Sequence, residues 1–156
     1  MGSNTVTRIL INPDLYLGGD MAAQSSQFFI KKNIKAVLNC TPEVPHYFPE
    51  RAEYARVSLG DSRESDDLSK MREMLEFAAE WIHIHRDVYG LNTLIHCNEG
   101  INRSASCLAA YLMKYRKMSL REVKEMYSLT RQAAFYHGSY ATFENQLLEF
   151  EKKYIK

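Results

Sequence analysis

The 156-residue sequence has few cysteines, no long apolar run and almost no excess charge of either sign. Its three cysteines are an odd number and too few for a disulfide framework. No apolar run approaches the roughly 20 residues that a membrane-spanning helix needs. The net charge of +1 lacks the strong basic excess that is typical of nucleic-acid-binding proteins. The composition therefore argues against a disulfide scaffold, a transmembrane segment and a nucleic-acid partner.

Length and composition are those of one ordinary globular domain. Hydrophobic residues make up 46% and charged residues 25% of the sequence, and both values are typical of folded domains. Because no repeat, low-complexity segment or linker is evident, we expect a single domain over residues 1–156, with about residues 1–6 flexible. The polar N-terminus predicts no signal peptide. Met1-Gly2-Ser3 predicts no lipid anchor, since Val6 stands where the myristoylation motif has Ser or Thr.

Short apolar segments alternate with amphipathic ones along the chain. Strands are predicted over residues 7–11, 15–17, 34–40, 53–59 and 92–96. Helices are predicted over residues 22–32, 67–88, 104–115 and 120–130, and around 143–150. This alternation predicts an α/β domain with a central mixed, mostly parallel sheet flanked by helices.

Three chemically useful residues each lie at the end of a predicted strand or shortly after it. They are Cys40, Asp61 and Cys97. In parallel sheets, ligands bind beyond the carboxyl ends of the strands. We therefore expect at least two of these residues to share one edge of the sheet.

The segment Leu94–Ser104 carries the strongest functional signal. It predicts an apolar strand, then Cys97, a turn containing Gly100, and Arg103 and Ser104 at the start of a helix. A helix N-terminus and a nearby cation lower the pKa of a cysteine thiol from about 8.5, which makes the sulfur a nucleophile. Ser104 is suited to donate a hydrogen bond to the sulfur when it leaves as an anion.

The same segment is suited to bind phosphate. Backbone N–H groups at a helix N-terminus bind anions, and the planar Arg103 guanidinium matches two phosphate oxygens. Gly100 lets the backbone turn without a side-chain clash. The alternative, that Cys97 is only a small buried hydrophobic residue, leaves Gly100 and Arg103 unexplained. The predicted phosphate-binding residues are Asn98, Glu99, Gly100, Ile101, Asn102 and Arg103.

The pattern His-Cys-x5-Arg-Ser at residues 96–104 resembles that of the cysteine-dependent protein phosphatases. Residues 110–113 and the segment Ile11–Gly18 resemble the small, atypical dual-specificity phosphatases of the protein tyrosine phosphatase superfamily. This resemblance implies a protein tyrosine phosphatase-like fold. It also implies hydrolysis of phosphotyrosine and phosphoserine/threonine in phosphoproteins through a cysteinyl-phosphate intermediate. No metal or cofactor is required, because the loop amides and Arg103 stabilise the charge.

The family places its general acid in a loop about 30 to 40 residues before the nucleophile, and Asp61 stands there. The resemblance implies that Asp61 protonates the leaving group and then activates water. The alternative is a turn or helix-capping role. Asp66 and Asp67 are competitors for the acid, but they suit the N-terminus of the long predicted helix better.

Other residues near the motif have roles that the sequence defines less sharply. Glu99 either points away from the bound phosphate or pairs with an arginine. His96 precedes the nucleophile in a strand, so its side chain faces the opposite side and a structural hydrogen bond is expected. In some relatives a second cysteine forms a reversible disulfide with the nucleophile; Cys40 is a candidate redox partner, although core packing is favoured. Cys107 is expected in the core.

Other functions compete with protein dephosphorylation. A phosphate-reading binding module would bind phosphorylated ligands through the same residues without hydrolysing them. A phosphoinositide phosphatase tends to have lysines in the loop, and none stands between Cys97 and Arg103. Asn102 also occurs in relatives that act on RNA 5′-triphosphates, but the near-neutral charge weakens that interpretation. A free catalytic thiol favours a reducing compartment, the cytoplasm or the nucleus. The sequence predicts no oligomeric state.

Overall fold

The computed structural model of the chain describes residues 6–58, 65–98, 102–130 and 143–155. The strands are β1 (Val6–Leu10), β2 (Leu15–Gly18), β3 (Ala36–Asn39), β4 (Glu53–Arg56) and β5 (Thr93–His96). The helices are α1 (Asp20–Ala23), α2 (Ser26–Lys31), α3 (Ser65–Ile82), its π-helical continuation η2 (His83–Val88), α4 (Asn102–Arg116), α5 (Leu120–Thr130) and α6 (Glu144–Tyr154).

The five strands form one sheet in the order β1-β2-β5-β3-β4. Strand β1 runs antiparallel to β2, and the other three pairs are parallel. Every residue of β2, β3 and β5 is buried, whereas β4 at the edge is partly exposed. Strands that are buried on both faces form near-continuous apolar runs in the sequence. The predicted α/β domain with a mixed, mostly parallel sheet is confirmed.

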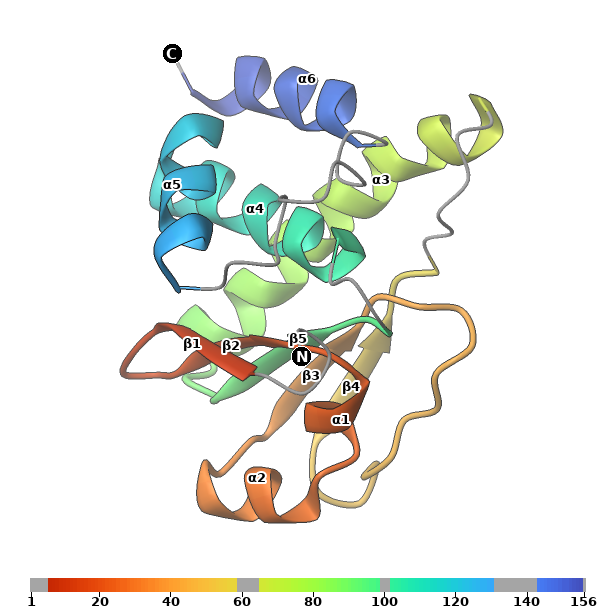
Figure 1. The fold of residues 1–156 in the computed structure, drawn as a ribbon, viewed down its shortest axis with the longest axis vertical. Coiled ribbons are helices and arrows are strands. Elements are labelled where there is room, and N and C mark those ends of the chain that lie inside the picture. The colour runs from red at the N-terminus through yellow and green to blue at the C-terminus, as the bar shows by residue number, and fades with distance from the viewer. Residues whose placement is uncertain (1–5, 59–64, 99–101, 131–142, 156) are drawn as a thin grey trace.

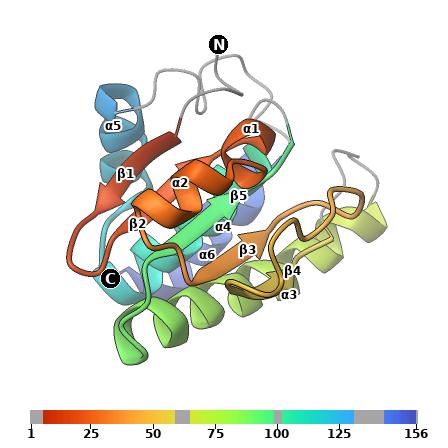
Figure 2. The same ribbon diagram turned by 90° about the horizontal axis from the view of Figure 1, so that it is seen from below.

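Helices cover both faces of the sheet. Helices α1 and α2 lie on one face, and α3, α4, α5 and α6 lie on the other (Figures 1 and 2). Helix α4 lies centrally in the larger layer and contacts α3, α5, α6 and the sheet. The N-terminus of α4 therefore meets the carboxyl end of β5 inside the protein.

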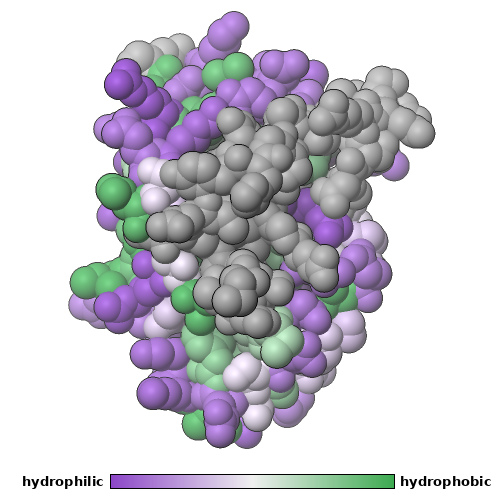
Figure 3. Space-filling view, viewed as in Figure 1, coloured by the Kyte–Doolittle hydropathy of each residue, from purple (hydrophilic) through white to green (hydrophobic). Residues whose placement is uncertain are grey.

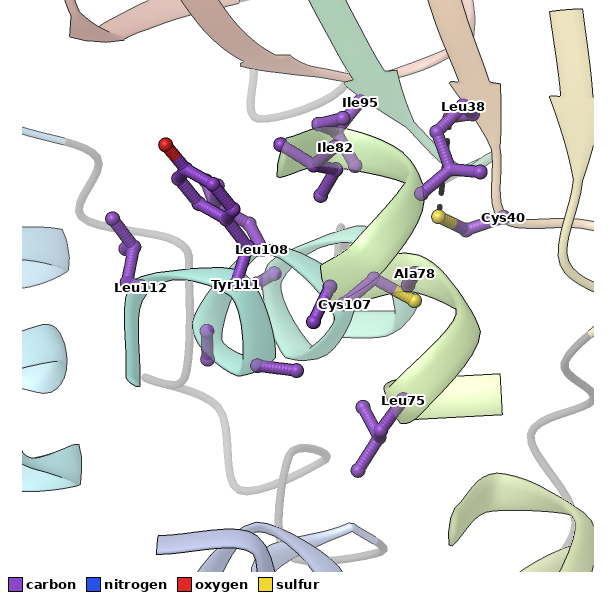
Figure 4. Packing of buried hydrophobic residues seen from close by; sticks show 14 of the residues in the cluster. Leu38, Cys40, Leu75, Ala78, Ile82, Ile95, Cys107, Leu108, Tyr111 and Leu112 are labelled. Carbon is purple, nitrogen blue, oxygen red and sulfur yellow. Dashed lines mark hydrogen bonds between the residues drawn. The ribbon is translucent and has the colours of Figure 1, made fainter. Parts of the chain in front are cut away.

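Alternate residues of each buried strand enter different cores, as the period of two in a strand requires. In the larger core, Leu38 and Ile95 of the sheet pack with Leu75 and Ile82 of α3 and with Leu108 of α4 (Figure 4). The smaller core lies between the sheet and the short helices. Its residues are Tyr16, Ala23, Phe29, Ile34, Val37 and Leu94.

The helix predicted over residues 22–32 is wrong as one element, because the chain forms two short helices there. Helix α1 ends at Ala23, and α2 begins after Ser25. The Ser25 hydroxyl accepts a hydrogen bond of 3.1 Å from the Phe28 backbone N–H. A serine that binds the backbone in this way starts a new helix and does not continue the preceding one.

Other element boundaries differ by a few residues. The long helix predicted over 67–88 begins at Ser65, and its last six residues are π-helical. Strands β3 and β4 pair over four residues each, so both are shorter than predicted. Strand β1 begins at Val6, which pairs with Gly18, within the stretch that was predicted to be flexible.

The capping box predicted before α5 is confirmed. The Ser119 hydroxyl accepts a hydrogen bond of 3.1 Å from the Glu122 backbone N–H. The Glu122 carboxylate accepts one of 2.8 Å from the Ser119 backbone N–H. These reciprocal bonds satisfy two backbone donors that a helix start leaves without partners.

A cluster of polar side chains links the turn between β1 and β2 to the helical layer through hydrogen bonds. The buried Arg86 donates hydrogen bonds to the backbone oxygens of Pro13 and Ile11, at 3.0 and 3.1 Å. Asp87 pairs with Arg86 and accepts a hydrogen bond from the Tyr111 hydroxyl. The cluster lies at the opposite edge of the sheet from the carboxyl ends of the parallel strands.

Among the coloured atoms of the helical layer in Figure 3, hydrophilic groups predominate. Apolar groups are exposed at the turn between β1 and β2, where Ile11 is 63% exposed. None of the described helices combines the length and the apolar character needed to cross a membrane.

Candidate active site

Cys97 lies directly beyond the carboxyl end of β5, and α4 begins five residues later. The Cys97 sulfur is fully buried and lies 3.2 Å from the Ser104 hydroxyl oxygen in the first turn of α4. The strand brings the sulfur to the edge of the sheet, and the helix returns toward it. The predicted strand, nucleophile and helix start therefore adjoin one another in the fold.

Two opposing influences act on the Cys97 thiol. Burial is the larger influence and raises the pKa of Cys97 above its ordinary value. Hydrogen bonds from the Ser104 hydroxyl and backbone, and then the Arg103 charge and backbone, act to lower the pKa. The predicted lowering of the pKa by a nearby cation is present as the Arg103 charge. The sequence did not predict that the desolvation of a fully buried sulfur would outweigh the influences that lower the pKa.

Arg103 lies in the same helical turn as Ser104, and its side chain is only 9% exposed. One of its terminal nitrogens, Nη1, lies 4.0 Å from the Glu43 carboxylate oxygen Oε1. Glu43 belongs to the connection between β3 and β4, so a neighbouring strand end supplies an acidic group to this site. Glu43 was not predicted from the sequence, although it also comes shortly after a buried parallel strand, β3.

His96 is buried and does not act on the thiol directly. Its Nδ1 lies 3.3 Å from the Cys97 backbone oxygen, and Nε2 has no hydrogen-bond partner within the described part of the chain. Burial lowers the pKa of His96 to about 4, so the imidazole is neutral near pH 7. The expected structural hydrogen bond is present.

Cys40 lies at the same edge of the sheet as Cys97. Its backbone N–H donates a hydrogen bond of 2.8 Å to the His96 oxygen, because β3 and β5 are neighbours. Burial raises the pKa of the Cys40 thiol, and the nearby Cys107 and Cys97 raise it further. Cys40 and Cys107 both lie in the core between the sheet and the helices (Figure 4). All three cysteines are buried, and none forms a disulfide bond.

The start of the predicted phosphate loop is supported by α1. The Asp20 backbone N–H donates a hydrogen bond of 3.3 Å to the Asn98 backbone oxygen. Asn102 is the first residue of α4. Asp66 and Asp67 are the second and third residues of α3. Four predicted site residues lie outside the described ranges: Asp61, Glu99, Gly100 and Ile101.

Across the described residues, no three His, Cys, Asp or Glu side chains are grouped so that they could hold a metal ion. The chemistry available here is that of a buried thiol beside a hydroxyl, a guanidinium and a helix N-terminus. Such an arrangement can bind an oxyanion and attack it with sulfur.

The chain is similar to proteins of a known family. A family model described as the catalytic domain of dual-specificity phosphatases matches residues 15–153 of the chain. The human "Dual specificity protein phosphatase 21" is 36% identical over 110 residues, or 70% of this chain. The chain spans 55% of that protein's length, and smaller shares of other curated relatives.

Two human crystal structures share the fold. Human DUSP28 superposes with a TM-score of 0.79 and 24% identity, covering 95% of this chain and 93% of that one. A human tyrosine phosphatase-like serine/threonine/tyrosine-interacting protein superposes with a TM-score of 0.80 and 23% identity, covering 97% and 98%. These likenesses extend over nearly the whole chain.

Proposed function

Because this chain belongs to the dual-specificity phosphatase catalytic-domain family, we propose that it hydrolyses phosphate esters on phosphoproteins. Phosphotyrosine and phosphoserine/threonine are both proposed as substrates. The observation that carries the proposal is the 3.2 Å contact between the Cys97 sulfur and the Ser104 hydroxyl, beside Arg103 at a helix start.

In the first step, the Cys97 thiolate attacks phosphorus and the ester oxygen leaves. The Arg103 guanidinium and the backbone N–H groups of residues 98–103 hold the phosphoryl oxygens and stabilise their charge. Asp61 gives its proton to the leaving oxygen, which contributes roughly 10²–10⁴-fold to the rate.

In the second step, water attacks the cysteinyl-phosphate. The Asp61 carboxylate takes a proton from this water, and the P–S bond breaks. Ser104 donates a hydrogen bond to the departing sulfur anion, for which its contact with Cys97 provides the geometry. Phosphate leaves, Cys97 is again a thiolate, and Asp61 is again protonated.

A Cys97→Ser variant tests the nucleophile. We expect it to lose hydrolysis of an aryl phosphate while still binding phosphopeptides, because Arg103 and the loop amides remain. A phosphoenzyme trapped by acid quench should form with the wild type and not with the variant. Turnover of the variant through a trapped phosphoenzyme would contradict the mechanism.

Asp61→Asn tests the general acid. We expect unchanged phosphopeptide binding and slower turnover, because only proton transfer is removed. Normal turnover by this variant would assign the acid to another residue.

The substrate class is tested by comparing phosphate release from phosphopeptides, phosphoinositides and 5′-triphosphate RNA. The absence of lysine between Cys97 and Arg103 supports phosphopeptides. The alternative of a binding module is suggested by the fold shared with a phosphatase-like interacting protein. Phosphopeptide binding without vanadate-sensitive hydrolysis would favour that alternative.

For Cys40 we propose core packing, with a reversible disulfide to oxidised Cys97 as the alternative. A thiol nucleophile must stay reduced to act, so we propose a reducing compartment, the cytoplasm or nucleus, as the location. Mass spectrometry after mild peroxide treatment separates the two roles of Cys40, because only the alternative yields a Cys40–Cys97 disulfide.

A further inference from the structure

Hydrogen bonds between buried polar groups hold the turn that carries Glu43. Asn39 donates a hydrogen bond of 2.7 Å to the Val44 oxygen and accepts one of 2.8 Å from the Thr41 hydroxyl. The Val44 backbone N–H donates one of 2.9 Å to the same hydroxyl oxygen. Arg56 of β4 donates a fourth, of 2.7 Å, to the Thr41 backbone oxygen. None of these bonds uses the Glu43 side chain, yet together they fix its backbone.

This turn directs an acidic group at the arginine of the proposed site. The Glu43 side chain is 53% exposed, and its oxygen lies 4.0 Å from Nη1 of the buried Arg103 guanidinium. A half-exposed ion pair adds little to the stability of a fold. The larger effect of such a neighbour is on phosphate binding. A long, flexible arginine side chain that is already oriented loses less conformational freedom when its guanidinium binds phosphate.

We infer that Glu43 is a positioning residue, which holds the Arg103 guanidinium in the orientation that binds the phosphoryl oxygens. This inference rests on the proposed function, since it assigns Glu43 a part in the same site. Glu43 acts through Arg103 and does not itself touch the phosphate.

The test is a double-mutant cycle with four proteins: wild type, Glu43→Gln, Arg103→Ala and the double variant. The readouts are kcat/KM for an aryl phosphate and the binding of vanadate measured by calorimetry. We expect Glu43→Gln to lower both by roughly fivefold, the upper end for a half-exposed ion pair. The same change should have no effect when Arg103 is already alanine.

Two further variants separate positioning from a general effect on structure. Glu43→Asp keeps the charge and should recover part of the lost kcat/KM. Glu53→Gln is the matched control, because Glu53 is also exposed and its carboxylate contacts a ring nitrogen of His85 at 3.0 Å, at the opposite end of the parallel strands. We expect Glu53→Gln to leave both readouts unchanged.

The outcomes distinguish this inference from the proposed function. Equal effects of Glu43→Gln with and without Arg103, or no effect in the wild-type background, would overturn the positioning role while leaving the phosphatase intact. A wild-type protein that binds vanadate through both residues but hydrolyses nothing would overturn the phosphatase and leave the positioning role standing. Absence of vanadate binding to the wild type would overturn both.

Discussion

At the scale of single residues, the Cys97 sulfur is the atom on which the proposed chemistry depends. Its burial raises the pKa of the thiol, while Ser104 and Arg103 act to lower it. The fraction of thiolate at a given pH therefore depends on a few neighbouring groups. Removing one of the groups that lower this pKa should move the titration of the Cys97 thiol toward higher pH.

Ser104→Ala should raise the pKa of Cys97 further. Because the thiolate is the nucleophile, the acidic limb of the kcat/KM profile should shift to higher pH, with about a tenfold loss below the thiol pKa, as for a hydrogen bond to a charged group. The rate of alkylation by iodoacetate as a function of pH measures the thiol pKa directly. Ser106→Ala is the matched control, since Ser106 is equally buried on the same helix. An unchanged alkylation profile in Ser104→Ala would contradict the role of this hydroxyl.

The sequence could bring together only those candidate site residues that are contiguous in the chain. Cys97, Arg103 and Ser104 form one motif whose spacing fixes their chemistry. Glu43 was missed because its contact with Arg103 arises only when β3 and β5 become neighbours in the sheet. The raised pKa of Cys97 was missed for a related reason, since burial depends on how elements distant in sequence pack around the sulfur.

At the scale of elements, α4 has two ends with different roles. Its N-terminus carries Arg103 and Ser104, and its C-terminus leads into the capping box of α5. A helix rises about 1.5 Å per residue, so α4 separates these ends by roughly 20 Å. Stability at the capping box should therefore be independent of chemistry at the thiol.

Ser119→Ala should destabilise the fold by about 1 kcal/mol, because it leaves the Glu122 backbone N–H without its capping oxygen. Urea unfolding measures this loss, and kcat/KM should not change. Ser128→Ala, within α5, removes an exposed hydroxyl that binds the Glu125 backbone oxygen, and should change stability by less than about 0.5 kcal/mol. Equal destabilisation by both variants would argue against the capping box as the cause.

Element types were predictable from hydrophobic period, whereas several boundaries were not. The buried strands and the capped helix α5 have strong local signals. The division of residues 22–32 into α1 and α2 depends on one competing hydrogen bond at Ser25, which a period of apolar residues does not reveal. The shortness of β3 and β4 depends on their pairing with each other, which is a property of the sheet.

At the scale of the whole molecule, His96 and Glu76 are two of the groups that link the stability of the fold to pH. Burial lowers the pKa of His96 to about 4. Burial also opposes ionisation of Glu76, but hydrogen bonds from Lys153, Tyr154 and Lys114 outweigh it and lower the pKa of Glu76. For both groups the unfolded chain takes up a proton at a higher pH than the folded protein, so acid favours unfolding.

The free energy of unfolding should fall by about 3 kcal/mol between pH 7 and pH 4 from His96 alone, because the pKa is ordinarily 6.5 and is about 4 in the folded protein. The loss begins as pH falls through 6.5 and is nearly complete at 4. Urea unfolding at several pH values measures it, and His96→Asn should flatten the dependence. A wild-type unfolding free energy that is constant across this range would show that His96 is not neutral when folded.

The strand order has a consequence for how the chain assembles. Strand β5 lies between β2 and β3 in the sheet, yet it follows both in the chain. During synthesis, β2 and β3 therefore have no strand to join them until residues 93–96 have left the ribosome. Until then each has an open edge that can pair with another nascent chain. The strand that precedes Cys97 is thus also the strand that joins the two halves of the sheet. A truncated chain that lacks it should aggregate.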